Sequence, residues 1–190
     1  MAKIIDEKIQ CQLNKKMTFF LKYFPARIRN VGEDAVEARN LVWAFKDNRE
    51  DAYEKVAQMT ASHLREEYGE DLSDLALVVV PASSPEKNEG RYKAFCNRVS
   101  ELTGICNGFP YIQVLNERLN WHDNRRNKKE LGTQYLDFDV SWLFGRKVVV
   151  MDDIVTTGTS YALLANKLEE FGAKVLGGMF LARTHYRYGK

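Results

Sequence analysis

Apolar residues recur along the chain with two different spacings, which predicts helices first and then strands that alternate with helices. Between residues 33 and 68 they recur every three or four positions, the period of an amphipathic helix. The polar "KDN" at 46–48 divides this stretch into two helices, and Asp47 or Asn48 would cap the second. Further on, the continuous apolar run "LALVVVP" (75–81) is typical of a strand covered on both faces.

The same alternation continues to the end of the chain. We expect a helix around 93–102, a short strand "YIQVL" (111–115), a strand "RKVVVMDD" (146–153), a helix over 160–171 closed by Gly172, and a strand "AKVLGGMFLART" (173–184). This order predicts an α/β fold with a mainly parallel sheet flanked by helices. A chain of 190 residues fits one domain, with 1–70 as an N-terminal extension and helices and 71–190 as the core.

Composition and the N-terminal segment narrow the class of protein. The stretch "MTFFLKYFPARIRN" (17–30) contains Pro25 and does not separate its basic residues onto one face, so a packed hairpin or cover is favoured over a membrane-surface segment. The sequence has no apolar run of about eighteen residues and no signal-peptide core, so we expect a cytoplasmic protein without a membrane partner. A net charge of +2 does not require nucleic acid, and three cysteines without CxxC spacing predict no zinc site or disulfide framework.

Two adjacent acids and a loop rich in hydroxyl groups follow the apolar run at 148–151. The acids are Asp152 and Asp153, and the loop contains Thr156, Thr157, Gly158, Thr159 and Ser160. Free N–H groups at the start of the next helix, with these hydroxyls, suit a terminal phosphate. Adjacent carboxylates need hydrogen-bond donors or a cation, which ribose hydroxyls and hydrated Mg²⁺ supply. The pattern predicts a phosphorylated ribose as ligand, and the simpler alternative is an exposed acidic turn with a Thr/Ser helix cap.

The stretch "VVVMDDIVTTGTS" (148–160) resembles the phosphoribosyl pyrophosphate (PRPP) motif of type I phosphoribosyltransferases. The resemblance implies that Asp152 and Asp153 form the catalytic pair and hold the ribose 2′- and 3′-hydroxyls. The cofactor Mg²⁺ would be held through PRPP and water, without direct protein ligands. Residues Thr156 to Ser160 would bind the 5′-phosphate.

Two further stretches, "VWAFKDNREDAYEKVAQM" (42–59) and "VVVPASSPEKNEGRYKAFCNRVSEL" (78–102), resemble the ComF-type branch of this superfamily, which is linked to competence and DNA uptake. The sequence departs from that branch where "GRYKAF" replaces the usual "RGFNQA", so Arg91 and Lys93 inherit no role from it.

A pyrophosphate group needs its own donors, and the loop after the strand at 75–81 can face the same crevice. In the family a short loop after an early strand binds pyrophosphate, which implicates Ala82, Ser83 and Ser84. The alternative is an ordinary turn between Pro81 and Pro85.

The segment 116–134 is long, polar and basic. It carries five cations, which are Arg118, Arg125, Arg126, Lys128 and Lys129. The family has a mobile loop at this place in the chain, so one interpretation is a lid that closes over the substrate and excludes water. A solvated surface loop is the equal alternative, and nucleic-acid binding is a less favoured one.

The resemblance implies an enzyme that transfers the 5-phosphoribosyl group of PRPP to a nitrogen acceptor and releases pyrophosphate. The alternative is a non-catalytic PRPP- or phosphoribosyl-binding regulator or DNA-uptake accessory module. No histidine stands out as a general base: His63, His122 and His185 lie in a helix, the basic segment and the tail. Dimers are the commonest oligomers and frequent in this family, so a homodimer is the assembly to test.

Overall fold

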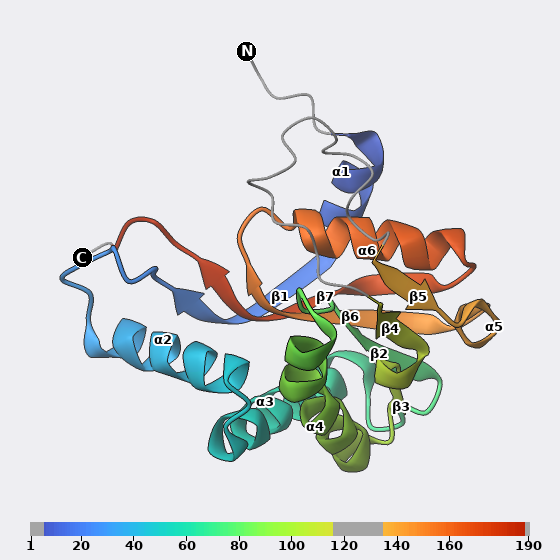
Figure 1. Ribbon diagram of the computed structural model, residues 1–190, viewed down its shortest axis with the longest axis horizontal. Helices are drawn as coiled ribbons and strands as arrows, with labels where there is room; N and C mark the ends of the chain where they lie inside the picture. The colour runs from blue at the N-terminus through green and yellow to red at the C-terminus, as the bar shows by residue number, and fades with distance from the viewer. Residues whose placement is uncertain (1–5, 116–134, 189–190) are drawn as a thin grey trace.

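A five-stranded parallel sheet carries the fold in the computed structural model, which describes residues 6–115 and 135–188 (Figure 1). The strands lie in the order β1 (Lys16–Tyr23), β7 (Lys174–Thr184), β6 (Lys147–Val155), β2 (Leu75–Val79) and β3 (Cys106–Asn107), and each neighbouring pair is parallel. The predicted α/β class with a mainly parallel sheet is confirmed. Because the strands are parallel, the C-terminal ends of β2, β6 and β7 meet at one edge of the sheet, where α/β proteins bind ligands.

Helices cover both faces of the sheet. One face packs against α2 (Glu33–Lys46), α3 (Glu50–Tyr68) and α4 (Pro85–Thr103), and the other against α1 (Glu7–Leu13) and α6 (Thr159–Glu170) (Figure 1). Strand β6 alternates between the two cores: Val149 and Met151 join the first, and Val148 and Val150 join the second. A strand buried on both faces has to be apolar at every position, which explains its unbroken hydrophobic run.

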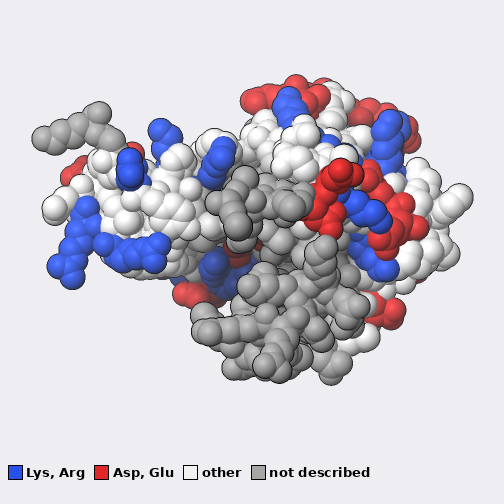
Figure 2. All heavy atoms as spheres, turned by 90° about the horizontal axis from the view of Figure 1, so that it is seen from above, with Lys and Arg blue, Asp and Glu red and all other residues white. Residues whose placement is uncertain are grey.

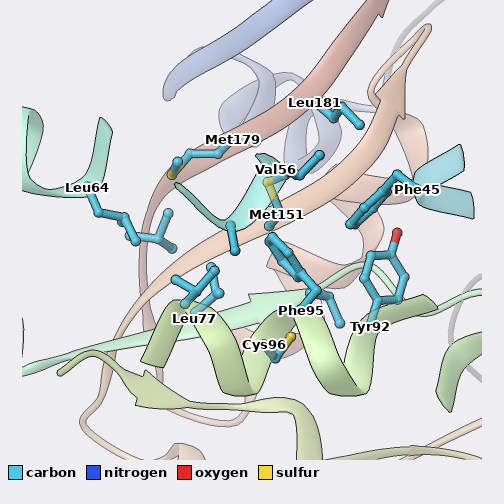
Figure 3. Packing of buried hydrophobic residues seen from close by; sticks show 14 of the residues in the cluster. Phe45, Val56, Leu64, Leu77, Tyr92, Phe95, Cys96, Met151, Met179 and Leu181 are labelled. Atoms are coloured by element: carbon cyan, nitrogen blue, oxygen red, sulfur yellow. The ribbon is translucent and has the colours of Figure 1, made fainter. Parts of the chain in front are cut away.

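Aromatic side chains dominate the core beneath the C-terminal edge of β6. Phe45 of α2 contacts Tyr92 and Phe95 of α4 edge to face, with ring centroids 6.1 and 5.3 Å apart, and Met151 lies beside them (Figure 3). This packing joins α2 and α4 to β6 just before the acidic pair, so side chains from both helices reach the end of that strand.

The prediction of a packed hairpin or cover for residues 17–30 needs correction in one respect, because the segment is packed but forms no hairpin. Residues 16–23 form an edge strand that runs parallel to β7, and α1 packs on α6. The physical reason lies in β7, because a Cβ at Gly177 would stand 2.4 Å from the main-chain oxygen of Lys16. Glycine at this position lets the two backbones approach.

Two smaller expectations also need correction. The strand predicted at 111–115 is β4 (Ile112–Val114), and it lies outside the main sheet, where it pairs antiparallel with β5 (Leu136–Phe138). The 3-10 turn η1 (Phe109–Tyr111) precedes β4, and the short helix α5 (Val140–Leu143) follows β5. The residue before α3 is Arg49, without a side-chain cap, and Asn48 occupies the turn with φ 56°. None of the helices among the described residues is long and apolar enough to cross a membrane.

Candidate functional site

The phosphate loop predicted at 156–160 lies between the end of β6 and the start of α6. Gly158 precedes the helix with φ +77° and ψ 3°, a left-handed conformation that favours glycine, and it provides no side-chain cap. The first N–H groups of a helix have no partner within it and carry partial positive charge. The loop, Asp152, Tyr161 and Phe180 line one cavity of about 150 Å³. The structure therefore brings one of the two acids and all five loop residues to the same opening.

The two acids lie in different surroundings. Asp153 is 6% exposed, and its Oδ2 lies 2.5 Å from Nη1 of Arg91 and its Oδ1 3.5 Å from Nζ of Lys46. Asp152 accepts hydrogen bonds from the main-chain N–H of Asp153 at 2.8 Å and from the hydroxyl of Tyr92 at 3.4 Å. The charge of Asp153 is therefore balanced by the protein itself, whereas Asp152 faces the cavity.

Burial raises the pKa of Asp152 well above its ordinary value, and the charge of Asp153 raises it further. The hydrogen bond from the Asp153 main chain and the charges of Lys46 and Arg91 act in the opposite direction. The surroundings of Asp152 therefore do not fully compensate its negative charge in the empty site. A strongly perturbed carboxyl group at a cavity is a typical feature of a functional site.

The loop at 82–84 reaches the same edge, because it follows β2, the neighbour of β6. Its groups are partly engaged in local structure. Ser84 caps α4 by accepting from the N–H of Lys87 at 3.3 Å, and the N–H of Ala82 donates to the side chain of Asn88 at 2.9 Å. Ser83 is exposed. The predicted pyrophosphate loop thus retains one serine side chain that faces solvent.

Three residues that contact the acidic pair were not predicted from the sequence: Lys46, Arg91 and Tyr92. The helix expected around 93–102 begins eight residues earlier, at Pro85. The signal was present, since Ser84 followed by proline is a typical helix start. The five lid candidates between Arg118 and Lys129 lie outside the described residues.

A divalent cation has no direct protein site in the part of the chain that the structure describes. No group of three or more His, Cys, Asp or Glu side chains there could hold a metal ion. Both oxygens of Asp153 already contact cations, and the cavity offers the single carboxylate of Asp152. This donor set fits Mg²⁺ only if a bound ligand and water supply most of its oxygen ligands. Among the described residues, the cavity also has no histidine in its lining.

Comparison with known proteins bears on the family resemblance. No protein-family model matches the chain. Over 125 residues it is 34% identical to the competence protein ComFC of Streptococcus pneumoniae (strain ATCC BAA-255 / R6), which covers 65% of this chain and 54% of ComFC. The chain thus spans about half the length of this curated relative. A solved phosphoribosyltransferase from Corynebacterium diphtheriae matches 78% of this chain and 96% of its own, at 14% identity and a TM-score of 0.39. The similarity to ComFC confirms, over those 125 residues, the resemblance of the chain to the ComF-type branch.

Proposed function

We propose that the chain binds PRPP and transfers its 5-phosphoribosyl group to a nitrogen acceptor, with release of pyrophosphate. The observation that carries the proposal is the single cavity that Asp152 shares with the loop Thr156–Ser160. A 5′-phosphate would accept hydrogen bonds from the first N–H groups of α6 and from the loop hydroxyls. The ribose hydroxyls would donate to the carboxylate of Asp152, whose charged form needs such donors.

In the proposed reaction the bond between C1 of the ribose and the pyrophosphate oxygen breaks, and its electron pair leaves with pyrophosphate. The acceptor nitrogen then bonds to C1 and loses a proton. Positive charge develops on the sugar as in other glycosyl transfers, and the carboxylate of Asp152 would stabilise it. Mg²⁺ bound to PRPP would neutralise charge on the departing pyrophosphate. The five cations of 116–134 would exclude water as a lid.

Calorimetric titration and a turnover assay together test this proposal. We expect saturable binding of ribose 5-phosphate, and of PRPP in the presence of Mg²⁺, with pyrophosphate released for at least one acceptor in a panel of nucleobases and amines. If the protein bound neither ribose 5-phosphate nor PRPP, the proposed binding site would be refuted. Binding of PRPP without release for any acceptor would refute the enzyme and favour a binding module.

A DNA-uptake accessory module is the second candidate, and a cationic surface favours it. Arginine side chains lie over aromatic rings in three places at one end of the molecule: Arg27 over Tyr186 at 5.4 Å, Arg39 over Trp43 at 6.0 Å, and Arg183 over Phe19 at 5.4 Å. Figure 2 shows several Lys and Arg side chains over the left-hand end of the molecule. Paired cations and aromatic rings suit single-stranded nucleic acid, whose bases stack and whose phosphates are anionic.

Salt-dependent binding of a fluorescent single-stranded oligonucleotide would support this second candidate. The double variant R27A/R183A should weaken that binding, and R98A serves as the control, because Arg98 pairs with Glu54 and Glu101 elsewhere on the surface. Equal affinities for the two variants would refute a role for the arginine–aromatic surface.

A further inference from the structure

We propose that Arg91, held in place by Asp153, binds the pyrophosphate group of PRPP, with Lys46 as a second contact. The inference rests on the proposed function and assigns a role to side chains that the family motif does not include. It makes Asp153 a positioning residue for two cations, while Asp152 faces the sugar. The starting observation is that the carboxylate of Asp153 contacts one cation from α4 and one from α2.

Arg91 has unused hydrogen-bonding capacity. A guanidinium has five N–H donors in a fixed fork. In Arg91, Nη1 donates to Asp153 at 2.5 Å, and the side chain of Tyr92 also lies within interaction range of the guanidinium. Its Nε is buried without a partner, and 17% of the side chain is exposed. The ion pair fixes the orientation of the guanidinium, and the exposed part of the side chain can reach an anion. Planar guanidinium groups are well suited to phosphate oxygens.

The position of Arg91 favours pyrophosphate over the 5′-phosphate as the bound group. Arg91 lies in α4, one turn after Asn88, whose side chain holds the N–H of Ala82 in the predicted pyrophosphate loop. The same helix begins at that loop, with Ser84 as its cap. Lys46 ends α2, and 32% of its side chain is exposed. Arg91 therefore lies beside the loop that follows β2, whereas Lys46 reaches the acidic pair from α2, which packs against β1, β6 and β7. The loop 156–160 begins helix α6 and contains no cation.

Charge balance gives a second reason. Arg91 and Lys46 together carry two positive charges, and Asp152 and Asp153 carry two negative charges when both are ionised. Only Asp153 contacts these two cations, so the three side chains that touch one another carry a net positive charge. Pyrophosphate carries several negative charges, so a site for it needs cations beyond the main-chain N–H groups of a short loop.

Three ligands and two matched variants test the inference. The ligands are inorganic pyrophosphate, PRPP and ribose 5-phosphate, each titrated calorimetrically with Mg²⁺ present. In R91M we expect affinity for pyrophosphate and PRPP to fall at least tenfold, and affinity for ribose 5-phosphate to stay within twofold of the unmodified protein. The control is R98M, since Arg98 lies two turns further along α4 and pairs with Glu54 at 2.8 Å. R98M should leave all three affinities unchanged.

The outcomes separate this inference from the proposed function. If the unmodified protein binds neither ribose 5-phosphate nor PRPP, the proposed function fails. If it binds both and R91M retains its pyrophosphate affinity, the role of Arg91 alone is refuted. Equal losses for all three ligands would indicate a structural role and would also overturn the inference. If R91M does not fold, R91K replaces it, because lysine keeps the charge beside Asp153 but loses the planar fork, and pyrophosphate affinity should still fall without loss of ribose 5-phosphate.

Discussion

Substitution of Gly158 by alanine tests whether the geometry of the phosphate loop matters for binding, and Gly104 provides a control with almost the same backbone. Gly158 has φ 77° and ψ 3°, and Gly104 has φ 74° and ψ 1°. In either position an alanine has to adopt a left-handed conformation, which costs roughly 1 kcal/mol. The two sites differ in their surroundings. A Cβ at Gly104 meets nothing within 4 Å, whereas one at Gly158 would stand 2.5 Å from Cδ2 of Leu13 in α1.

We therefore expect G104A to lower the free energy of unfolding by about 1 kcal/mol and G158A by about 2–3 kcal/mol, since relief of an overpacked contact adds roughly 1–2 kcal/mol. Urea denaturation measures both values. Leu13 is partly buried where α1 packs on α6, so we expect part of the strain to fall on the loop, and G158A should bind ribose 5-phosphate at least tenfold more weakly while G104A binds it normally.

A control for the cause of this difference is the double variant L13A/G158A. Compared with L13A alone, the double variant should be less stable only by the cost of a left-handed alanine, about 1 kcal/mol, because the methyl group that the new Cβ would meet is absent. The reasoning would be refuted if G158A and G104A were equally stable, or if G158A retained full affinity for ribose 5-phosphate.

Three further substitutions have directions that follow from the structure. Because the folded state raises the pKa of Asp152, its contribution to stability is present below the unfolded pKa of about 3.9 and is lost as the pH rises through the folded value. Asp152→Asn should therefore melt at a higher temperature than the unmodified protein at pH 7.5, and the difference should shrink towards pH 4; an equal difference at both pH values would contradict this. Asp153→Asn leaves two partly buried cations without their anion and should lower the free energy of unfolding, measured in urea, by roughly 2 kcal/mol. This loss is smaller than for a fully buried ion pair because about a third of the Lys46 side chain is exposed. Gly177→Ala places a methyl group against the main-chain oxygen of Lys16 and should destabilise the edge strand by more than about 2 kcal/mol, whereas Gly90→Ala, in open space on α4, should stabilise slightly; similar stabilities for the two would refute the close approach of β1 to β7.

Most of the sheet could be predicted from the sequence, because the patterns that mark its strands and the first helices are local. The apolar runs of β2, β6 and β7 need no knowledge of their neighbours, and the spacing of α2 and α3 is a helical period within one stretch. The phosphate loop was also accessible, because the hydroxyl residues, Gly158 and the preceding acids are consecutive and the end of a strand brings them together. Local pattern therefore identified the part of the site that a single segment builds.

The rest of the site depends on contacts between distant segments, which local spacing does not reveal. Lys46 and Arg91 reach Asp153 from positions 107 and 62 residues earlier in the chain, and each reads in the sequence as an ordinary surface cation. The edge strand β1 was missed for the same reason, because its place beside β7 depends on Gly177 and on main-chain approach rather than on its own pattern. Charge partners and edge pairings of this kind become visible only when the helices are placed against the sheet.

The surroundings of the acidic pair lead to a final prediction, which concerns proton release on binding. Burial and the charge of Asp153 raise the pKa of Asp152, so a fraction of Asp152 carries a proton when the pH is near that value. Ribose hydroxyls that donate to this carboxylate would stabilise its charged form and lower the pKa, and binding would then release a proton. Calorimetric titration of ribose 5-phosphate in two buffers with different ionisation enthalpies should give different heats, and affinity should increase as the pH rises. In Asp152→Asn the difference between the two buffers should be smaller, because only the phosphate of the ligand is then left to exchange a proton. The buried charge of Asp152 destabilises the empty site at neutral pH, and hydrogen bonds from the sugar would offset that cost on binding. Identical buffer effects for the unmodified protein and the variant would show that the carboxyl group of Asp152 does not face the ligand.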